Sequence, residues 1–120
     1  MIRAAALLLA LAAPAAAQEA VATYGTGPTP LMFRSTTDIA VLGPTIQTFT
    51  EANPDITVTY EQWGSNALYK LTLDGCQSGD DTADAVLSSG VHQMVELVNM
   101  ACARPYRSAL TATLSSERIW

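Results

Sequence analysis

Alternating and apolar segments in this chain predict three short β-strands. Ile56, Val58 and Tyr60 alternate with polar residues, which is the period of a half-buried strand. The segments 31–34 and 83–87 are short and rich in apolar residues. Because residues 83–87 are nearly all apolar, we expect them to form a strand buried at the centre of a parallel sheet.

Each predicted strand is followed by a segment in which apolar residues recur at helical spacing. The first begins near Ile39 and ends at Asn53-Pro54-Asp55. The second covers about residues 67–74 and the third about residues 91–101. The apolar stripes of these helices are Ile39, Leu42, Ile46 and Phe49 in the first, Leu68 and Leu71 in the second, and Met94, Leu97, Val98 and Ala101 in the third.

Capping and breaking residues mark the ends of these helices. Thr37 or Asp38 is placed to cap the first helix through a side-chain oxygen. Pro44 lies inside it and has no backbone N–H, so we expect a loose or bent first turn. Gly75 is expected to end the second helix. Arg104-Pro105-Tyr106-Arg107 interrupts the third.

The order of these elements is β-α-β-α-β-α, which predicts an α/β fold with a parallel-sheet core flanked by helices on both faces. Right-handed crossovers would place the strand at 31–34 between the other two. The carboxyl ends of the strands at 31–34 and 83–87 would then be neighbours. Ligands collect at such adjacent carboxyl ends in open α/β sheets.

The two ends of the chain differ in character from the segments between them. Residues 1–17 combine a short basic start, an apolar run and an A-x-A cleavage site, which is the pattern of a secretory signal peptide. The apolar run is shorter than the roughly 20 residues that a bilayer-spanning helix needs. Residues 18–30 are small and polar, with glycines and prolines, and are interpreted as a flexible lead-in. From residue 108 to Trp120 the periodicity is weak and no closing strand is evident.

The composition is acidic, with 11 Asp and Glu against 6 Lys and Arg and a formal net charge of −5. Removal of residues 1–17 would also remove Arg3 and make the chain more acidic. Nucleic-acid binding needs clustered Lys and Arg, so nucleic acid is not expected as a partner. Small ligands are not restricted in this way, because local geometry at a site outweighs net charge.

The chain has two cysteines, Cys76 and Cys102. Export to an oxidising compartment favours a disulfide between them, and two separate buried thiols are the alternative. Their spacing does not fit a metal knuckle, and two cysteines with one distant histidine make a poor zinc set. We therefore expect neither a metal nor a cofactor.

Two of the predicted strands end in clusters of hydroxyl-bearing residues where a helix should begin. Ser35-Thr36-Thr37-Asp38 follows the first strand, and Ser88-Ser89-Gly90 follows the third. A helix start presents unpaired N–H groups and a partial positive charge, so such turns suit a polar or anionic ligand. The alternative is that one hydroxyl merely caps each helix. Four polar residues in a row exceed that need, and Gly90 would let a ligand approach the backbone.

Other polar residues give weaker signals for function. His92, the only histidine, lies in the first turn of the third helix and is interpreted as a surface residue. Ser88 and His92 do not form a nucleophile and base, because no glycine-framed elbow surrounds the serine and no acid is placed to orient the imidazole. No enzymatic activity is expected.

Clusters of acidic and aromatic residues are also interpreted structurally. Asp80, Asp81 and Asp84 do not follow the calcium-loop pattern and are assigned to a solvated turn. Trp63 and Tyr69 flank the turn after the second strand and are candidates to line a cleft. Core packing is the commoner fate of such aromatic side chains.

Several of these segments together resemble a known family. Residues 31–38 and 49–58, with the pattern strand, Ser/Thr turn, helix, Asn-Pro-Asp, strand, are similar to the amino-terminal lobe of bacterial extracellular solute-binding proteins. The better match is the iron(III)-type (family 1) and related periplasmic components of ABC importers. Residues 66–69 and 83–89 resemble the segments that follow. The resemblance covers about residues 31–106.

This resemblance implies a fold, a function and partners. The fold would be lobe 1 of a periplasmic-binding-protein-like protein of type II, over residues 31–120. The function would be to bind a small polar or anionic solute, such as iron(III) or an organic or phosphorylated anion, and to deliver it to a membrane permease as a periplasmic monomer. Ser35, Thr36 and Thr37 match the first ligand-contacting turn. Ser88 and Ser89 match the second.

The same resemblance leaves alternatives open. Family members are much longer, so the chain is interpreted as a truncated amino-terminal lobe. The tyrosines that hold iron in this family lie outside the matching part, and no residue here inherits that role. A ligand-sensing subunit of a two-component system would share the fold. A truncated product without activity is the remaining alternative.

Overall fold

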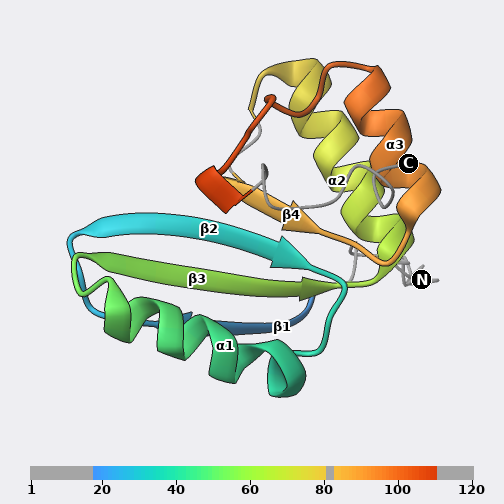
Figure 1. Cartoon of the computed structure of the whole chain (residues 1–120). Helices are drawn as coiled ribbons and strands as arrows, with labels where there is room; N and C mark the ends of the chain where they lie inside the picture. The colour runs from blue at the N-terminus through green and yellow to red at the C-terminus, as the bar shows by residue number, and fades with distance from the viewer. Residues whose placement is uncertain (1–17, 81–82, 111–120) are drawn as a thin grey trace, which may run out of the picture.

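The computed structural model describes residues 18–80 and 83–110, and the expected signal peptide lies outside these residues. Figure 1 shows strands and helices alternating along most of the chain. The elements are β1 (Gln18–Tyr24), β2 (Thr29–Ser35), α1 (Ile39–Ala52), β3 (Ile56–Trp63), α2 (Ser65–Ser78), β4 (Ala85–Leu87) and α3 (Val91–Asn99). No helix among the described residues is long and apolar enough to span a bilayer.

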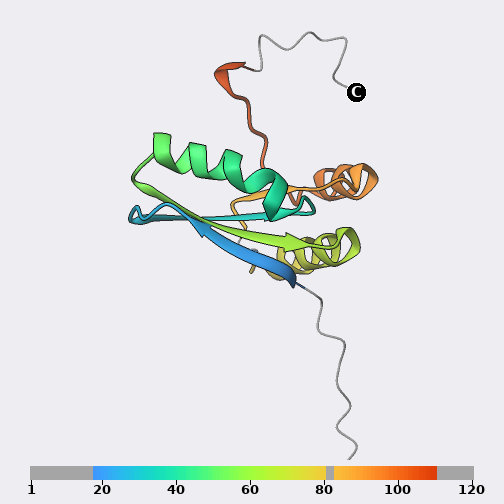
Figure 2. The ribbon, with the colours of Figure 1, turned by 90° about the horizontal axis from the view of Figure 1, so that it is seen from below.

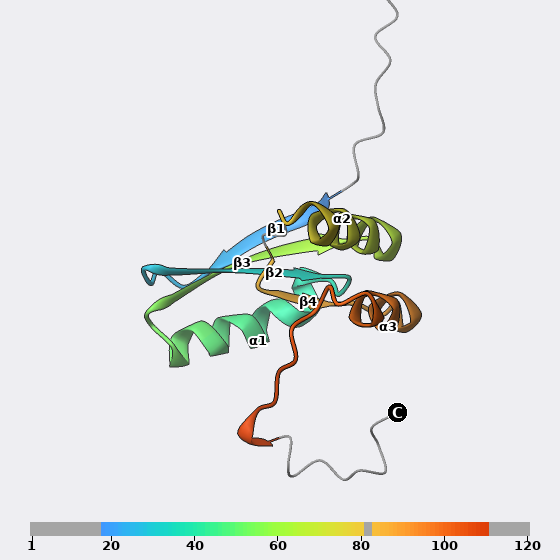
Figure 3. The same ribbon diagram turned by 90° about the horizontal axis from the view of Figure 1, so that it is seen from above.

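The four strands form one sheet in the order β1-β3-β2-β4. β2 pairs in parallel with β3 from Thr29–Ile56 to Ser35–Gln62, and in parallel with β4 on its other side. The expected position of the first predicted strand, between the other two, is therefore confirmed. Figures 2 and 3 show α1 on one side of the sheet and α2 on the other, which confirms the expected α/β layering.

Strand β1 corrects the expectation of a flexible lead-in. It pairs antiparallel with β3, from Gln18 opposite Trp63 to Tyr24 opposite Val58. Its residues are mostly exposed, and Val21 is 52% exposed. An edge strand with one exposed face carries little apolar periodicity, so sequence pattern alone gave no strand signal here. The backbone of β3, which needs partners along both edges, stabilises it.

The core lies between the sheet and the helices. Val58 and Tyr60 of β3 are buried, and the Phe33 ring of β2 packs against Tyr60 with ring centroids 5.0 Å apart. Leu68 of α2 and Leu97 of α3 are also buried, as their apolar stripes predicted. Because β3 supplies most of the buried strand residues, it anchors the sheet.

Two helix ends differ from their predictions. Asp38 occupies the N-cap position of α1 but makes no side-chain capping bond. Instead, the Ile39 N–H donates to Gln62 Oε1 at 2.9 Å. Helix α1 also continues through Pro44. Helix α2 passes Gly75 and ends at Gly79, which has φ +78°. That left-handed conformation favours glycine, whereas an interior glycine costs a helix only about 1 kcal/mol.

Strand β4 and helix α3 are more exposed than the sequence predicted. Leu87 is 47% exposed, because no other described strand pairs with the outer edge of β4. The expectation of a buried central strand is therefore wrong. In α3 the buried residues are Gln93 and Leu97, while Val98, which was expected to face inward, is 60% exposed.

A disulfide joins Cys76 of α2 to Cys102, just after α3, with the two Cα atoms 5.4 Å apart. Of the two states left open by the sequence, the structure has the bonded one. Because the bond closes a chain segment with a sequence separation of 26 residues, it restricts the unfolded chain and holds α2 against α3.

We expect the double variant Cys76→Ser/Cys102→Ser to lose about 3 kcal/mol of unfolding free energy, as a loop of this length predicts. Urea unfolding followed by circular dichroism measures this loss. The wild-type chain in reductant should match the variant. A variant as stable as the oxidised wild type would contradict a stabilising disulfide.

Candidate functional site

The two hydroxyl-rich turns meet at the carboxyl ends of β2 and β4. The Thr36 backbone N–H donates to the Leu87 carbonyl at 3.1 Å, which extends the strand pairing into the turns. The Ser89 backbone N–H donates to Thr36 Oγ1 at 3.0 Å, and the Thr36 and Ser89 hydroxyl oxygens lie 3.3 Å apart. The expected neighbourhood of these turns is therefore confirmed, and they form one continuous polar surface.

Hydrogen bonds from Ser35 and from Tyr60 of β3 fix the shape of the first hydroxyl turn. Ser35 is fully buried, and its Oγ accepts the Thr37 N–H at 2.9 Å. The Tyr60 hydroxyl, rising from β3, donates to the Thr37 carbonyl at 2.6 Å. Ser35 therefore shapes the turn from inside, a position that differs from the surface contact expected of it. Thr36 and Thr37 are half-buried and face the surface of the turn.

The second turn leads into α3. The Ser88 Oγ accepts the Gly90 N–H at 3.0 Å, and no side chain caps the helix itself. Ser88 is half-buried and Ser89 is exposed. The N–H groups of Ser89, Gly90 and Val91 are thus paired within the chain, and the polar surface of this turn consists chiefly of its two hydroxyls.

Gln62, at the end of β3, connects the first turn to its neighbours. Its Nε2 donates to Asp38 Oδ1 at 2.8 Å and to Glu19 Oε2 at 3.0 Å, and its Oε1 accepts the Ile39 N–H. The sequence analysis missed this residue. Its place in the alternation with Val58 and Tyr60, on the buried side of β3, was the available signal.

Asn66 and Gln93 join the first turns of α2 and α3. The Gln93 Nε2 donates to Asn66 Oδ1 at 2.9 Å, and Gln93 is buried while Asn66 is exposed. These residues were also missed, because their contact depends on how two helices lie in space. The start of α2 thus reaches the second hydroxyl turn through a pair of amides.

A buried ion pair lies beneath the turns. Arg34 of β2 is 8% exposed, and its Nε lies 2.8 Å from Glu61 Oε2. The Trp63 indole N–H donates to the same carboxylate oxygen at 3.1 Å, and Trp63 is buried. Of the two roles expected for Trp63, lining a cleft or packing in the core, the structure shows core packing. Because Glu61 balances the guanidinium, Arg34 adds little positive charge to the surface above.

Among the other candidate residues, His92 lies at the surface as expected, whereas Asp84 is bonded to β2 and is not part of a solvated turn. His92 is exposed on α3. Asp84 extends the strand pairing, since its Oδ2 accepts the Met32 N–H at 2.7 Å. Asp81 lies outside the described residues. Among the described residues no group of three or more His, Cys, Asp or Glu side chains is arranged to hold a metal ion.

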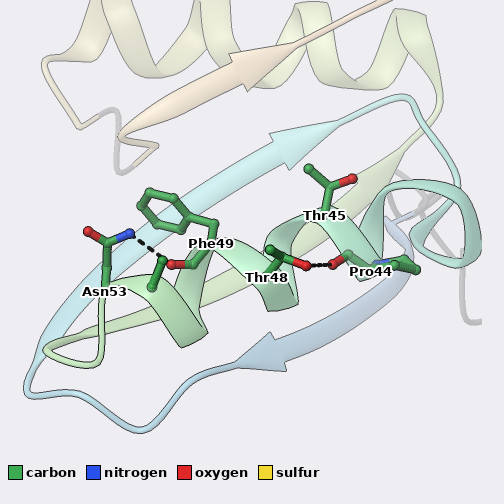
Figure 4. A pocket seen from close by; sticks show the side chains of 6 residues that line it. Pro44, Thr45, Thr48, Phe49 and Asn53 are labelled. Atoms are coloured by element: carbon green, nitrogen blue, oxygen red, sulfur yellow. Dashed lines mark hydrogen bonds between the residues drawn. The ribbon is translucent and has the colours of Figure 1, made fainter.

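Two surface hollows lie near this framework. Figure 4 shows a shallow one along α1, lined by Pro44, Thr45, Thr48, Phe49, Ala52 and Asn53. The Thr48 hydroxyl and the Asn53 amide there bond to carbonyls of the helix itself, so they offer a ligand little. The other hollow lies between β4, α3 and residues 101–106, and Ser88 is part of its lining.

Comparison with known proteins gives a structural relative. No protein-family model and no curated protein matches the sequence. A crystal structure described as the substrate binding protein of the ABC transporter from Agrobacterium tumefaciens matches with a TM-score of 0.80 and 29% sequence identity. The match covers 88% of this chain and 32% of the other.

The fold is that of a periplasmic-binding-protein-like lobe. The chain spans about a third of the length of that relative, so the match concerns one part of a larger protein. In this lobe, the two hydroxyl turns occupy the carboxyl ends of parallel strands, where α/β sheets place their ligands.

Tyr60→Phe tests the support of the first turn. Loss of the hydroxyl leaves the carbonyl of the half-buried Thr37 without this donor, so we expect a loss of about 1 kcal/mol in unfolding free energy. Urea unfolding at pH 7 measures it. Tyr106→Phe, at an 85% exposed residue, is the matched control. Equal stability of the two variants would contradict the role of Tyr60.

The variants Tyr60→Phe and Tyr106→Phe should also differ in how their unfolding free energy changes at alkaline pH. Burial raises the pKa of Tyr60, while the hydrogen bond to Ser35 lowers it in part. The unfolded chain then releases this proton near pH 10 and the folded chain only at higher pH. Stability from this tyrosine is therefore complete below pH 10 and falls as pH rises through the folded pKa. Between pH 9 and 11, wild type and Tyr106→Phe should lose more stability than Tyr60→Phe. Identical slopes in urea unfolding would contradict this.

Proposed function

We propose that this chain is the solute-binding component of an ABC importer and acts outside the cytoplasm. Its ligand is a small polar solute, and its protein partner is a membrane permease. The observation that carries the proposal is the contact between Thr36 and Ser89, which makes one hydroxyl-lined surface from two helix starts. The structural relative, a substrate binding protein of an ABC transporter, supports the same function.

The chemistry of this surface supports binding without catalysis. Its groups are mainly hydroxyls and amides, which form hydrogen bonds, and a hydroxyl becomes a nucleophile only when a general base activates it. Thr36, Thr37, Ser88 and Ser89 are the proposed contacts, with Ser35 supporting them from inside the turn. Iron(III) is not part of the proposal, because the resemblance places the iron-binding tyrosines outside the matching segment.

The location of the site also favours transient, specific binding. Ligands in α/β sheets bind outside the carboxyl ends of the strands, and here three helices begin at that edge. The turns are held by hydrogen bonds to Tyr60 and Leu87, so their polar groups are oriented before the solute arrives. Such preorganisation reduces the entropy that binding must overcome.

A nuclear magnetic resonance titration with a library of small solutes tests the proposal. A binding solute should shift the backbone amide signals of residues 35–38 and 88–90 first. With that solute, Thr36→Val should weaken affinity about tenfold, since it removes a hydroxyl at the centre of the surface. Thr48→Val, at an exposed threonine on α1, is the control. Shifts confined to the hollow along α1 would contradict the site.

A further inference from the structure

Gln93 contains a buried hydrogen-bond acceptor without a donor. The residue is 8% exposed, and its Oε1 has no partner among the described residues, although its Nε2 donates to Asn66. A buried polar atom left unpaired is costly, and most such atoms in folded proteins have a partner. The arrangement is therefore more favourable when a further molecule donates a hydrogen bond to this oxygen.

The unpaired oxygen points at the second hydroxyl turn. A side chain at position 90 would collide with Gln93 Oε1, and its Cβ would stand 3.3 Å from Ser88 Oγ. Gly90 therefore lets Gln93 Oε1 lie against the backbone of the second hydroxyl turn. For a solute to contact this oxygen, the Gln93 amide would have to rotate toward the surface beside Ser88 and Ser89.

Asn66 adds a donor to the same place. It is exposed in the first turn of α2, and its Oδ1 is occupied by Gln93. Because Asn66 is exposed, its Nδ2 can donate to a solute at the surface. The linked amides thus offer a donor and an acceptor close together. Neighbouring hydroxyl groups of a sugar or polyol, each both donor and acceptor, fit such a pair.

The charge around the first turn disfavours an anionic solute. Asp38 and Glu19 are exposed carboxylates that converge on Gln62, next to the start of α1. Their negative charge offsets the partial positive charge of the helix start and repels an anion. Arg34 is balanced by Glu61. Arg104 lines the hollow that Ser88 also lines, and a guanidinium donates to hydroxyl oxygens as well as to anions.

We propose that Gln93 and Asn66 are further contacts of the proposed solute site, and that the solute is uncharged and rich in hydroxyl groups, as a sugar or polyol is. This inference rests on the proposed function and narrows its ligand class. The proposed solute-binding surface then consists of the first turns of α1, α2 and α3. The Thr36–Ser89 and Asn66–Gln93 contacts join them.

Titrations of the full chain with defined probes test the inference. The probes are trehalose, maltose and glycerol as neutral hydroxylated solutes, inorganic phosphate and citrate as anions, and putrescine as a cation. We expect amide shifts at residues 66, 88–90 and 93 with a neutral probe, and none there with the charged ones. For the binding probe, Gln93→Leu should weaken affinity about tenfold and Asn66→Ala about threefold.

Controls separate this inference from the function on which it rests. Gln47→Leu, at an exposed glutamine of α1, should leave affinity unchanged. Asn66→Ala changes an exposed side chain, so it reports on binding even if Gln93→Leu fails to fold. Binding of phosphate, citrate or putrescine in place of the neutral probes overturns the inference and leaves the proposed function standing. Equal affinities of Gln93→Leu and Gln47→Leu overturn the role of Gln93. If none of the neutral probes binds, the inference is overturned, and the titration with the solute library decides the proposed function separately.

Discussion

The backbone ladder that pairs β2 with β3 on one side and with β4 on the other brings three helix starts to one end of the sheet. Parallel strands end at the same edge, so the turns after them must lie side by side. The bond from the Thr36 N–H to the Leu87 carbonyl continues that ladder by one step. The contact of Thr36 with Ser89 follows from it, and so does the single polar surface.

Side chains from β3 then fix the shape of this surface. Tyr60 holds the Thr37 carbonyl, and Gln62 holds the N-terminus of α1 through the Ile39 N–H and Asp38. Each of these bonds pairs a backbone group that a helix start or a tight turn would otherwise leave unpaired. Through these bonds, β3 is both the core strand and the support of the site.

Much of this framework could be predicted from the sequence, for physical reasons that differ between elements. The alternation in β3 and the apolar run in β2 reflect burial, and the hydroxyl clusters mark the turns directly. β1 was missed because its exposed edge position leaves little apolar pattern. The apolar run at 83–87 predicted a buried strand, yet exposure depends on what packs beside β4 and not on its own residues.

The polar contacts at the site were the least predictable part. Gln93 and Asn66 are 27 residues apart in the sequence, and Gln62 reaches Glu19 across 43. Such bonds depend on the relative position of helices and strands, which no local pattern encodes. The hydroxyl turns were recognised because their residues are neighbours in the sequence as well as in space.

A binding surface on one side of a solute limits how tightly the solute binds. Specific small-molecule sites enclose about 70–90% of a ligand's surface, whereas helix starts at one sheet edge contact it from one side. In a protein of the relative's length, of which this lobe corresponds to 32%, the other polypeptide is available to cover the opposite side. In the proposed function, the lobe would then contribute mainly by orienting the solute. Its hydroxyls and amides would select a solute by the positions of its donors and acceptors, and enclosure by a facing surface would supply most of the affinity.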